Sequence, residues 1–169
     1  MTKKATAGPA IGIDIGGVLI RPAREGGDTS FFSSGYLETP MVDGAFEAVA
    51  RLNKTRFADR VFLVSKAKSG TARKTIEWLA HHDFHDKTGV PLERVRFCEE
   101  RAEKAIIATR LGLTAFVDDR LDVLMHLKAV ETRILFAATD AFAPNEVPPG
   151  VRLAVGWHDA LAMLGAVDM

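Results

Sequence analysis

The sequence contains a single cysteine and has no excess of charge of either sign. Cys98 stands alone among 169 residues, which excludes an internal disulfide and is compatible with a reducing compartment. The 22 lysines and arginines balance 22 acids, so no overall field attracts nucleic acid or an anionic membrane. A local basic patch remains compatible with this balance, because net charge averages over the whole surface.

Long apolar runs are also missing. No segment approaches the roughly 20 apolar residues that cross a bilayer, and no run of signal-peptide length precedes Asp14. Hydrophobic residues make up 47% of the chain and charged residues 26%, a composition typical of globular proteins in water. We therefore predict a cytoplasmic protein without membrane association.

The length is that of one domain. A chain of 169 residues can bury one hydrophobic core and is too short for two ordinary ones. We predict a disordered tail over residues 1–9 and a single domain over residues 10–169. Nothing in the sequence determines the oligomeric state.

Short apolar runs alternate with amphipathic segments along the chain. The predicted strands are residues 10–13, 61–64, 95–98, 114–117, 133–136 and 151–155. The predicted helices are residues 44–53, 71–84, 101–111, 121–130 and 157–164, with Gly112 placed to cap the third. This alternation predicts an α/β fold, a three-layer Rossmann-like arrangement of a parallel sheet with helices on both faces.

Residues 21–40 depart from that alternation. The segment is rich in glycine and serine and carries Phe31, Phe32 and Tyr36. A long irregular loop after the first strand lies where α/β sheets bind ligands, so a functional loop is one interpretation. A surface loop with a small aromatic plug is the other, and both remain open.

Polar side chains follow several predicted strands. Asp14, Ser65 and the pair Asp118-Asp119 end apolar runs, and Lys104 follows the run at 95–98. Since parallel strands present their carboxyl ends at one edge, these groups are expected to converge there. Each alone would also suit a turn or a helix cap. Together they supply oxygen ligands for Mg2+ and donors for a phosphoryl group.

Taken in order, these segments resemble the motifs of the haloacid dehalogenase superfamily of phosphohydrolases. The matching stretches are Ile-Gly-Ile-Asp-Ile-Gly-Gly-Val-Leu at 11–19, Val-Phe-Leu-Val-Ser at 61–65, Lys104, and Thr-Ala-Phe-Val-Asp-Asp-Arg at 114–120. The stretch Pro-Met-Val-Asp-Gly-Ala at 40–45 is similar to the family as well. The resemblance covers residues 11 to about 164 and implies a small haloacid dehalogenase-like domain.

The resemblance implies a phosphoryl-transfer role for four residues. Asp14 would be the nucleophile that accepts the phosphoryl group. Ser65 and Lys104 would act with it as catalytic residues that hold the phosphoryl oxygens. Lys66, beside Ser65, would contribute to substrate binding.

The same resemblance implies a magnesium site. Asp14 would be a ligand through its carboxylate, and Gly16 through its backbone carbonyl. Asp118 and Asp119 would complete the site, and the sequence does not decide which of the two binds the ion directly. Asp122, one turn further along the chain, could contact these ligands without binding the ion itself.

One position departs from the family pattern. The phosphatases of the family carry an aspartate two residues after the nucleophile, where this chain has Gly16. That aspartate acts as general acid and base, a contribution of about 100- to 10,000-fold in rate. Three interpretations remain open: a slow phosphatase, a phosphatase for substrates with good leaving groups, and a catalytically weak or inactive relative that binds a phosphorylated ligand or partner. Glu38 or Asp43 could also reach the vacated position.

The spacing of the motifs leaves no room for an inserted cap domain, so the site is expected to be open. Family members of this kind often act on macromolecular phosphates. Residues 65–70 and 117–120 are also similar to the phosphatase domain of polynucleotide kinase-phosphatases. Lys66, Lys68 and Arg73 would then join Lys74 in a basic rim for a polynucleotide or phosphoprotein. A solvated helix start is the interpretation that the sequence favours for these cations, because charge clusters on helices are usually surface features.

Two further interpretations complete the prediction. A receiver-type or flavodoxin-like domain is an alternative fold, but receivers place their acid pair after the first strand, which disagrees with the order found here.

Trp78 and Trp157 lie at helical positions and are interpreted as packing residues, and Cys98 as a buried core residue.

Overall fold

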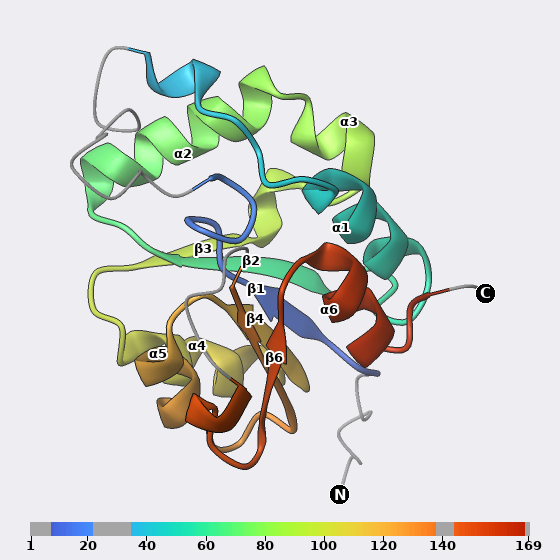
Figure 1. Ribbon diagram of the computed structural model, residues 1–169. Helices are drawn as coiled ribbons and strands as arrows, with labels where there is room; N and C mark the ends of the chain where they lie inside the picture. The colour runs from blue at the N-terminus through green and yellow to red at the C-terminus, as the bar shows by residue number, and fades with distance from the viewer. Residues whose placement is uncertain (1–7, 22–34, 138–143, 168–169) are drawn as a thin grey trace, which may run out of the picture.

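Six parallel strands form a single sheet in the order β3-β2-β1-β4-β5-β6 (Figure 1). The computed structural model describes residues 8–21, 35–137 and 144–167. The strands are β1 (Ile11–Ile13), β2 (Val61–Lys66), β3 (Val95–Cys98), β4 (Ala115–Asp118), β5 (Thr132–Phe136) and β6 (Val151–Ala154). All six predicted strands are confirmed. Most of the predicted N-terminal tail and of the loop at 21–40 lies outside the described residues.

Helices cover both faces of the sheet (Figure 1). One face carries α1 (Ala45–Lys54), α2 (Ser69–His81), α3 (Phe84–Thr88) and α6 (Trp157–Met163), and the other carries α4 (Glu103–Leu111) and α5 (Leu121–His126). Short 3-10 turns are η2 (Tyr36–Glu38), η3 (Leu92–Arg94) and η4 (Pro144–Glu146). The three-layer α/β architecture predicted from the sequence is therefore confirmed.

Alternation along the strands divides the core into two layers. Ile11 and Ile13 of β1 pack under α1, α2 and α6, whereas Phe116 of β4 packs under α4 and α5. Successive strand residues point to opposite faces, so a strand buried on both sides is apolar throughout. This double burial explains why the central runs in the sequence are continuous rather than alternating.

Two predicted helices end earlier than their apolar spacing indicated. The helix predicted at 71–84 stops at His81 and a new helix begins at Phe84, because Asp83 adopts a left-handed backbone conformation with φ of 56°. The helix predicted at 121–130 ends at His126. Leu127 and Val130 are nevertheless buried. Their apolar spacing therefore comes from a turn that packs on the core and not from a further turn of helix.

The described connections contain no separate cap domain. Residues 35–60 hold η2 and α1, and residues 67–94 hold α2, α3 and η3. None of the helices in the described part of the chain is long and apolar enough to cross a membrane.

Gly12 of β1 is required by close packing against β4. A Cβ atom at this position would lie 2.6 Å from Cε2 of Phe116 and 2.7 Å from Cδ1 of Leu113. Phe116 is fully buried in a close-packed core, which limits how far its ring can move away. The absence of a side chain at residue 12 therefore lets the Phe116 ring lie across the central strand.

We predict that Gly12→Ala lowers the free energy of unfolding by about 1–3 kcal/mol, the usual cost of overpacking a core. Urea denaturation followed by circular dichroism measures the change. Gly156→Ala is the matched control, because in the described part of the chain no heavy atom beyond its chain neighbours lies within 4 Å of a Cβ there, and its φ of 176° is extended. Equal stability of the two variants would show that the Phe116 ring can reorient.

Candidate functional site

Two neighbouring strands bring the predicted acids together. Asp14 directly follows β1, and Asp118 is the last residue of β4, which pairs with β1 in parallel. The backbone N–H of Asp14 donates to the carbonyl oxygen of Val117 at 2.9 Å, which extends the pairing of the two strands to the acid itself. The two carboxylates therefore lie side by side at the carboxyl edge of the sheet, as predicted.

Lys104 bridges these two acids. Its Nζ lies 3.2 Å from Oδ1 of Asp14 and 2.8 Å from Oδ2 of Asp118. All three side chains are buried, with Lys104 only 2% exposed. Lys104 stands in the first turn of α4, where the helix dipole disfavours a cation, so the carboxylates rather than the helix stabilise its charge.

Asp118 accepts two hydrogen bonds. Lys104 donates to Oδ2, and the backbone N–H of Arg120 donates to Oδ1 at 2.9 Å. The hydrogen bond from the Arg120 N–H orients the Asp118 carboxylate within the turn that follows β4. The guanidinium of Arg120 points elsewhere and pairs with Asp122 at 3.1 Å, so Asp122 is engaged outside the acid cluster.

Asp119 completes a cluster of three acids, the acid triad of Asp14, Asp118 and Asp119. One carboxylate oxygen from each lies within 4.8 Å of the others. The Asp119 carboxylate lies over Gly17, where a Cβ would be 2.2 Å from its Oδ2. Gly17 has a φ of +79°, so both its backbone conformation and its lack of a side chain are needed for this approach.

The electrostatics of the acid triad favour a cation. Burial, the largest cause, raises the pKa of Asp14, Asp118 and Asp119 to about 6 each, and repulsion within the triad adds to it. Burial opposes protonation of Lys104, but Asp14 and Asp118 outweigh it and raise the Lys104 pKa. A single ammonium cannot neutralise three carboxylates. A divalent ion would supply the missing charge.

The donor chemistry of the acid triad fits magnesium. Carboxylate oxygens are the ligands that this hard cation prefers, and a site of a few carboxylates leaves coordination positions for water and substrate oxygens. Asp14, Asp118 and Asp119 offer such oxygens from two adjoining turns. The triad could hold Mg2+, whereas Lys104 holds the two buried acids in place beside it.

Ser65 and Lys66 lie at the adjoining strand end. Ser65 is the fifth residue of β2, is 8% exposed, and follows the segment that pairs with β1. Lys66 ends the strand and is exposed. Both residues therefore lie at the same edge of the sheet as the triad. Their roles toward substrate stay predictions.

The position of Gly16 is open. Gly16 is exposed, and among the described residues no heavy atom beyond its chain neighbours lies within 4 Å of where its Cβ would be. Asp43, one of the acids that could have reached this position, instead accepts a hydrogen bond from Arg21 at 2.7 Å. Glu38 lies exposed in η2. The role of the Gly16 carbonyl as a metal ligand stays a prediction.

The predicted basic rim is only partly free. Lys66, at the end of β2, and Lys68, directly before α2, are both exposed. Arg73 instead lies 3.9 Å from Glu77, and Nζ of Lys74 lies 5.3 Å from the centre of the Tyr36 ring. Two of the four cations therefore have partners on the helix or on η2.

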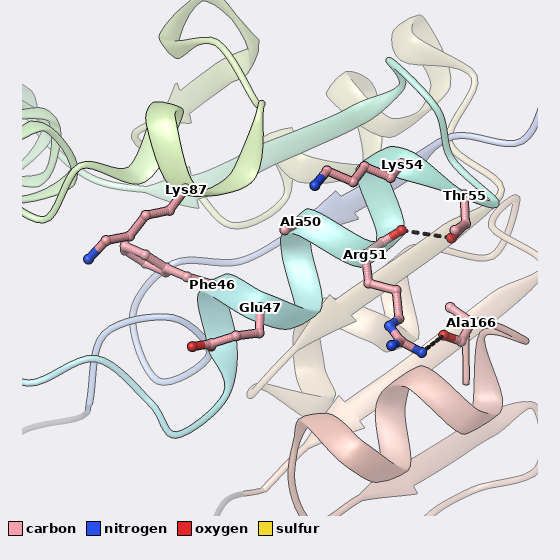
Figure 2. A pocket seen from close by; sticks show the side chains of 8 residues that line it. All are labelled: Phe46, Glu47, Ala50, Arg51, Lys54, Thr55, Lys87 and Ala166. Atoms are coloured by element: carbon pink, nitrogen blue, oxygen red, sulfur yellow. Dashed lines mark hydrogen bonds between the residues drawn. The ribbon is translucent and has the colours of Figure 1, made fainter. Parts of the chain in front are cut away.

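A separate groove of about 550 Å3 runs along the outer side of α1 (Figure 2). Lys54 and Lys87 border it, and Arg51 reaches across it to the carbonyl oxygen of Ala166 at 3.3 Å. None of the predicted site residues lines this groove. The chemistry indicated by the acid triad is therefore not assigned to this cavity.

The tertiary structure shows two residues that contribute to the site and that the sequence did not indicate. Gly17 belongs to the glycine pair after the first strand, but nothing in its spacing indicated that Asp119 lies against it. Trp157 is buried, as a packing residue should be, yet its indole Nε1–H also donates to the carbonyl oxygen of Val18 at 3.0 Å. Residue 157 is too distant in sequence from the turn for any local motif to reveal this bond.

Comparison with known proteins shows the fold. The chain matches a haloacid dehalogenase-like family hydrolase from Xanthomonas campestris with a TM-score of 0.63 and 15% identity, over 96% of each chain. It also matches a haloacid dehalogenase-like hydrolase from Burkholderia xenovorans with a TM-score of 0.51 and 17% identity, over 74% of this chain and 59% of that one. No protein-family model and no curated protein matches the sequence. The chain thus has the haloacid dehalogenase-like fold, with a buried acid triad at its sheet edge.

We predict that Mg2+ raises the melting temperature by several degrees at pH 7.5 and by almost nothing at pH 5. The triad carboxyls have pKa values of about 6, so at pH 5 protons compete with the ion for the same oxygens. Differential scanning fluorimetry with and without Mg2+ across this range measures the effect. A shift that is independent of pH would place the ion away from the triad.

We further predict that Asp119→Asn raises the melting temperature of the metal-free protein at pH 7 and removes the response to Mg2+. The folded-state pKa of about 6 lies above the ordinary 3.8, so ionising Asp119 costs stability as pH rises from about 4 to about 6. Asp122→Asn is the control, because Asp122 pairs with Arg120 outside the triad and its pKa is lowered. A retained Mg2+ response in Asp119→Asn would remove Asp119 from the metal site.

Proposed function

We propose that this chain is a magnesium-dependent phosphohydrolase that transfers a phosphoryl group to Asp14. The observation that carries the proposal is the bridge from Lys104 to Asp14 and Asp118, 3.2 Å and 2.8 Å long, inside a buried acid triad. A buried lysine between two carboxylates at the edge of a parallel sheet serves little purpose in packing. It suits a site that must hold an ionised nucleophile beside an anionic substrate.

The reaction proceeds in two displacements. An oxygen of the Asp14 carboxylate attacks phosphorus, the bond from phosphorus to the leaving oxygen breaks, and an aspartyl-phosphate forms. Water then attacks the same phosphorus, the bond to the Asp14 oxygen breaks, and inorganic phosphate leaves with the carboxylate restored. Lys104 holds Asp14 in position and, with the Ser65 hydroxyl, donates to the phosphoryl oxygens as their charge develops.

Magnesium bound to Asp14, Asp118, Asp119 and the Gly16 carbonyl would reduce the repulsion between the nucleophile and the phosphate. In its absence the raised pKa of Asp14, about 6, still leaves the carboxylate largely ionised near neutral pH. The nucleophile therefore needs no separate base to activate it. The two events that require acid–base help are instead the departure of the leaving group and the attack of water.

The leaving oxygen receives no proton from residue 16. Gly16 has no side chain, and Asp43 is paired with Arg21. Substrates whose leaving group is stable as an anion are therefore favoured over alkyl phosphates, since proton donation is worth about 100- to 10,000-fold.

A second candidate function is binding without turnover. The bare and exposed position of Gly16 favours it, because without an acid at this position the bond from phosphorus to the leaving oxygen would break slowly. The site would then retain a phosphorylated ligand or partner. The intact bridge at Lys104 serves this function equally well.

The substrate is proposed to be phosphorylated and to include macromolecules. The described connections beside the site hold no cap, and the exposed ammonium groups of Lys66 and Lys68 lie at the β2–α2 turn. Cations at this end of the sheet would bind further phosphates of a larger substrate such as a nucleic acid.

We predict that the wild-type protein hydrolyses p-nitrophenyl phosphate only with Mg2+, and that Asp14→Asn abolishes the activity. Nitrophenolate leaves without a proton, so this substrate avoids part of the defect at Gly16. Gly16→Asp is expected to raise turnover, by about 100-fold or more for an alkyl phosphate and by less for the nitrophenyl ester. Release of phosphate measures both reactions.

Two controls accompany this experiment. Asp122→Asn removes an acid outside the triad, and Gly156→Asp adds an acid at another open glycine. Neither should change the rate. Absence of turnover in every variant, with Mg2+ binding still measurable by calorimetry, would support the binding function instead.

A further inference from the structure

We propose that Trp157 is a positioning residue for the metal site, acting through its hydrogen bond to the turn that carries Gly16 and Gly17. The inference rests on the proposed function, because it concerns the affinity of the acid triad for Mg2+. It assigns a role to α6, a helix that contributes no residue to the triad itself.

The turn after Asp14 is closed by its own backbone. The carbonyl oxygen of Ile15 accepts from the N–H groups of Val18, Leu19 and Ile20 at 3.2, 2.8 and 3.1 Å. The N–H of Gly17 donates to the carbonyl oxygen of Ile20 at 2.8 Å. These bonds determine the shape of the turn but not its placement relative to the sheet.

Hydrogen bonds from other segments help to place the far side of this turn, together with the burial of its own apolar side chains in the core. The N–H of Val42 donates to the carbonyl oxygen of Leu19 at 2.8 Å. The indole N–H of Trp157 donates to the carbonyl oxygen of Val18 at 3.0 Å, with both residues buried. Burial and packing restrict the movement of the indole, whose ring lies against Phe136 at the end of β5 with ring centres 5.3 Å apart.

The turn placed in this way supports Asp119. Gly17 lies directly under the Asp119 carboxylate, close enough that a Cβ would be 2.2 Å from Oδ2. A displacement of the turn toward Asp119 would therefore push this ligand, and a displacement away would leave it without support. The backbone of Gly16 would move with its neighbour. The hydrogen bond from Trp157 thus limits the distance between two parts of the metal site.

Trp78 offers a matched control within the same chain. Its indole N–H donates to the carbonyl oxygen of Thr39 at 2.9 Å, and its side chain is fully buried in the same core layer. Thr39 lies next to η2 and outside the turn that carries Gly16. Loss of either indole N–H leaves one buried carbonyl without its donor, so the two losses have similar costs to folding.

The test compares Trp157→Phe with Trp78→Phe, using Mg2+ alone as the probe in isothermal titration calorimetry. Both substitutions keep an aromatic ring and remove the N–H donor. We expect Trp157→Phe to weaken Mg2+ binding about 10- to 100-fold, the usual effect of removing a group that orients a ligand. Trp78→Phe should leave the affinity for Mg2+ within about twofold of the wild-type value. It should lower the melting temperature as much as Trp157→Phe does, because the hydrogen bond of Trp78 contributes to stability alone.

A second measurement needs no folded Trp157 variant. The chain has two tryptophans and therefore two indole N–H signals in a proton–nitrogen NMR spectrum. Trp78→Phe assigns the remaining signal to Trp157. On titration of the wild-type protein with Mg2+, the Trp157 signal should shift with the same dissociation constant as the calorimetry, and the Trp78 signal should not.

The possible results distinguish the role of Trp157 from the proposed metal site itself. Unchanged Mg2+ affinity in Trp157→Phe, or an equal loss in Trp78→Phe, would overturn the role of Trp157 while the metal site stands. A wild-type protein that does not bind Mg2+ would overturn the proposed function, and the positioning role with it. A Trp157 signal that stays fixed through a saturating titration would contradict the coupling even if the variant cannot be purified.

Discussion

The ammonium of Lys104, buried between Asp14 and Asp118, is the interaction on which the site depends. Without it two adjacent carboxylates would face each other inside the protein, and one of them would be protonated. With it the acids are held at hydrogen-bond distance, but the acid triad as a whole still carries more negative charge than its lysine balances. The fold thus builds a site that is stable enough to form and remains attractive to a divalent cation.

Long-range contacts hold the polypeptide around that site. Asp118 is oriented by the backbone of Arg120 from its own turn, whereas the turn after Asp14 is held by Trp157 from the C-terminal helix. The parallel sheet makes this possible because every strand ends at the same edge. Residues separated by more than 100 positions in the chain therefore act within a single constellation.

Three glycines near β1 serve three physical purposes. Gly12 allows the Phe116 ring to cross the strand, and Gly17 allows the Asp119 carboxylate to approach a left-handed backbone. No described residue beyond its chain neighbours would contact a Cβ at Gly16, so the described part of the structure gives no steric reason for a glycine there. Its effect is therefore chemical: the position can hold an acid, and in this chain it holds none.

The sequence by itself determined the α/β class, the six strands and the convergence of Asp14, Lys104, Asp118 and Asp119, because apolar periodicity and polar strand ends are local signals. It misplaced the ends of two helices, where a left-handed Asp83 and a buried turn at Leu127 broke the expected pattern. Only the tertiary structure decided that Gly17 supports Asp119 and that Trp157 holds Val18. Such contacts join elements across the fold, and no spacing along one segment encodes which partner lies opposite.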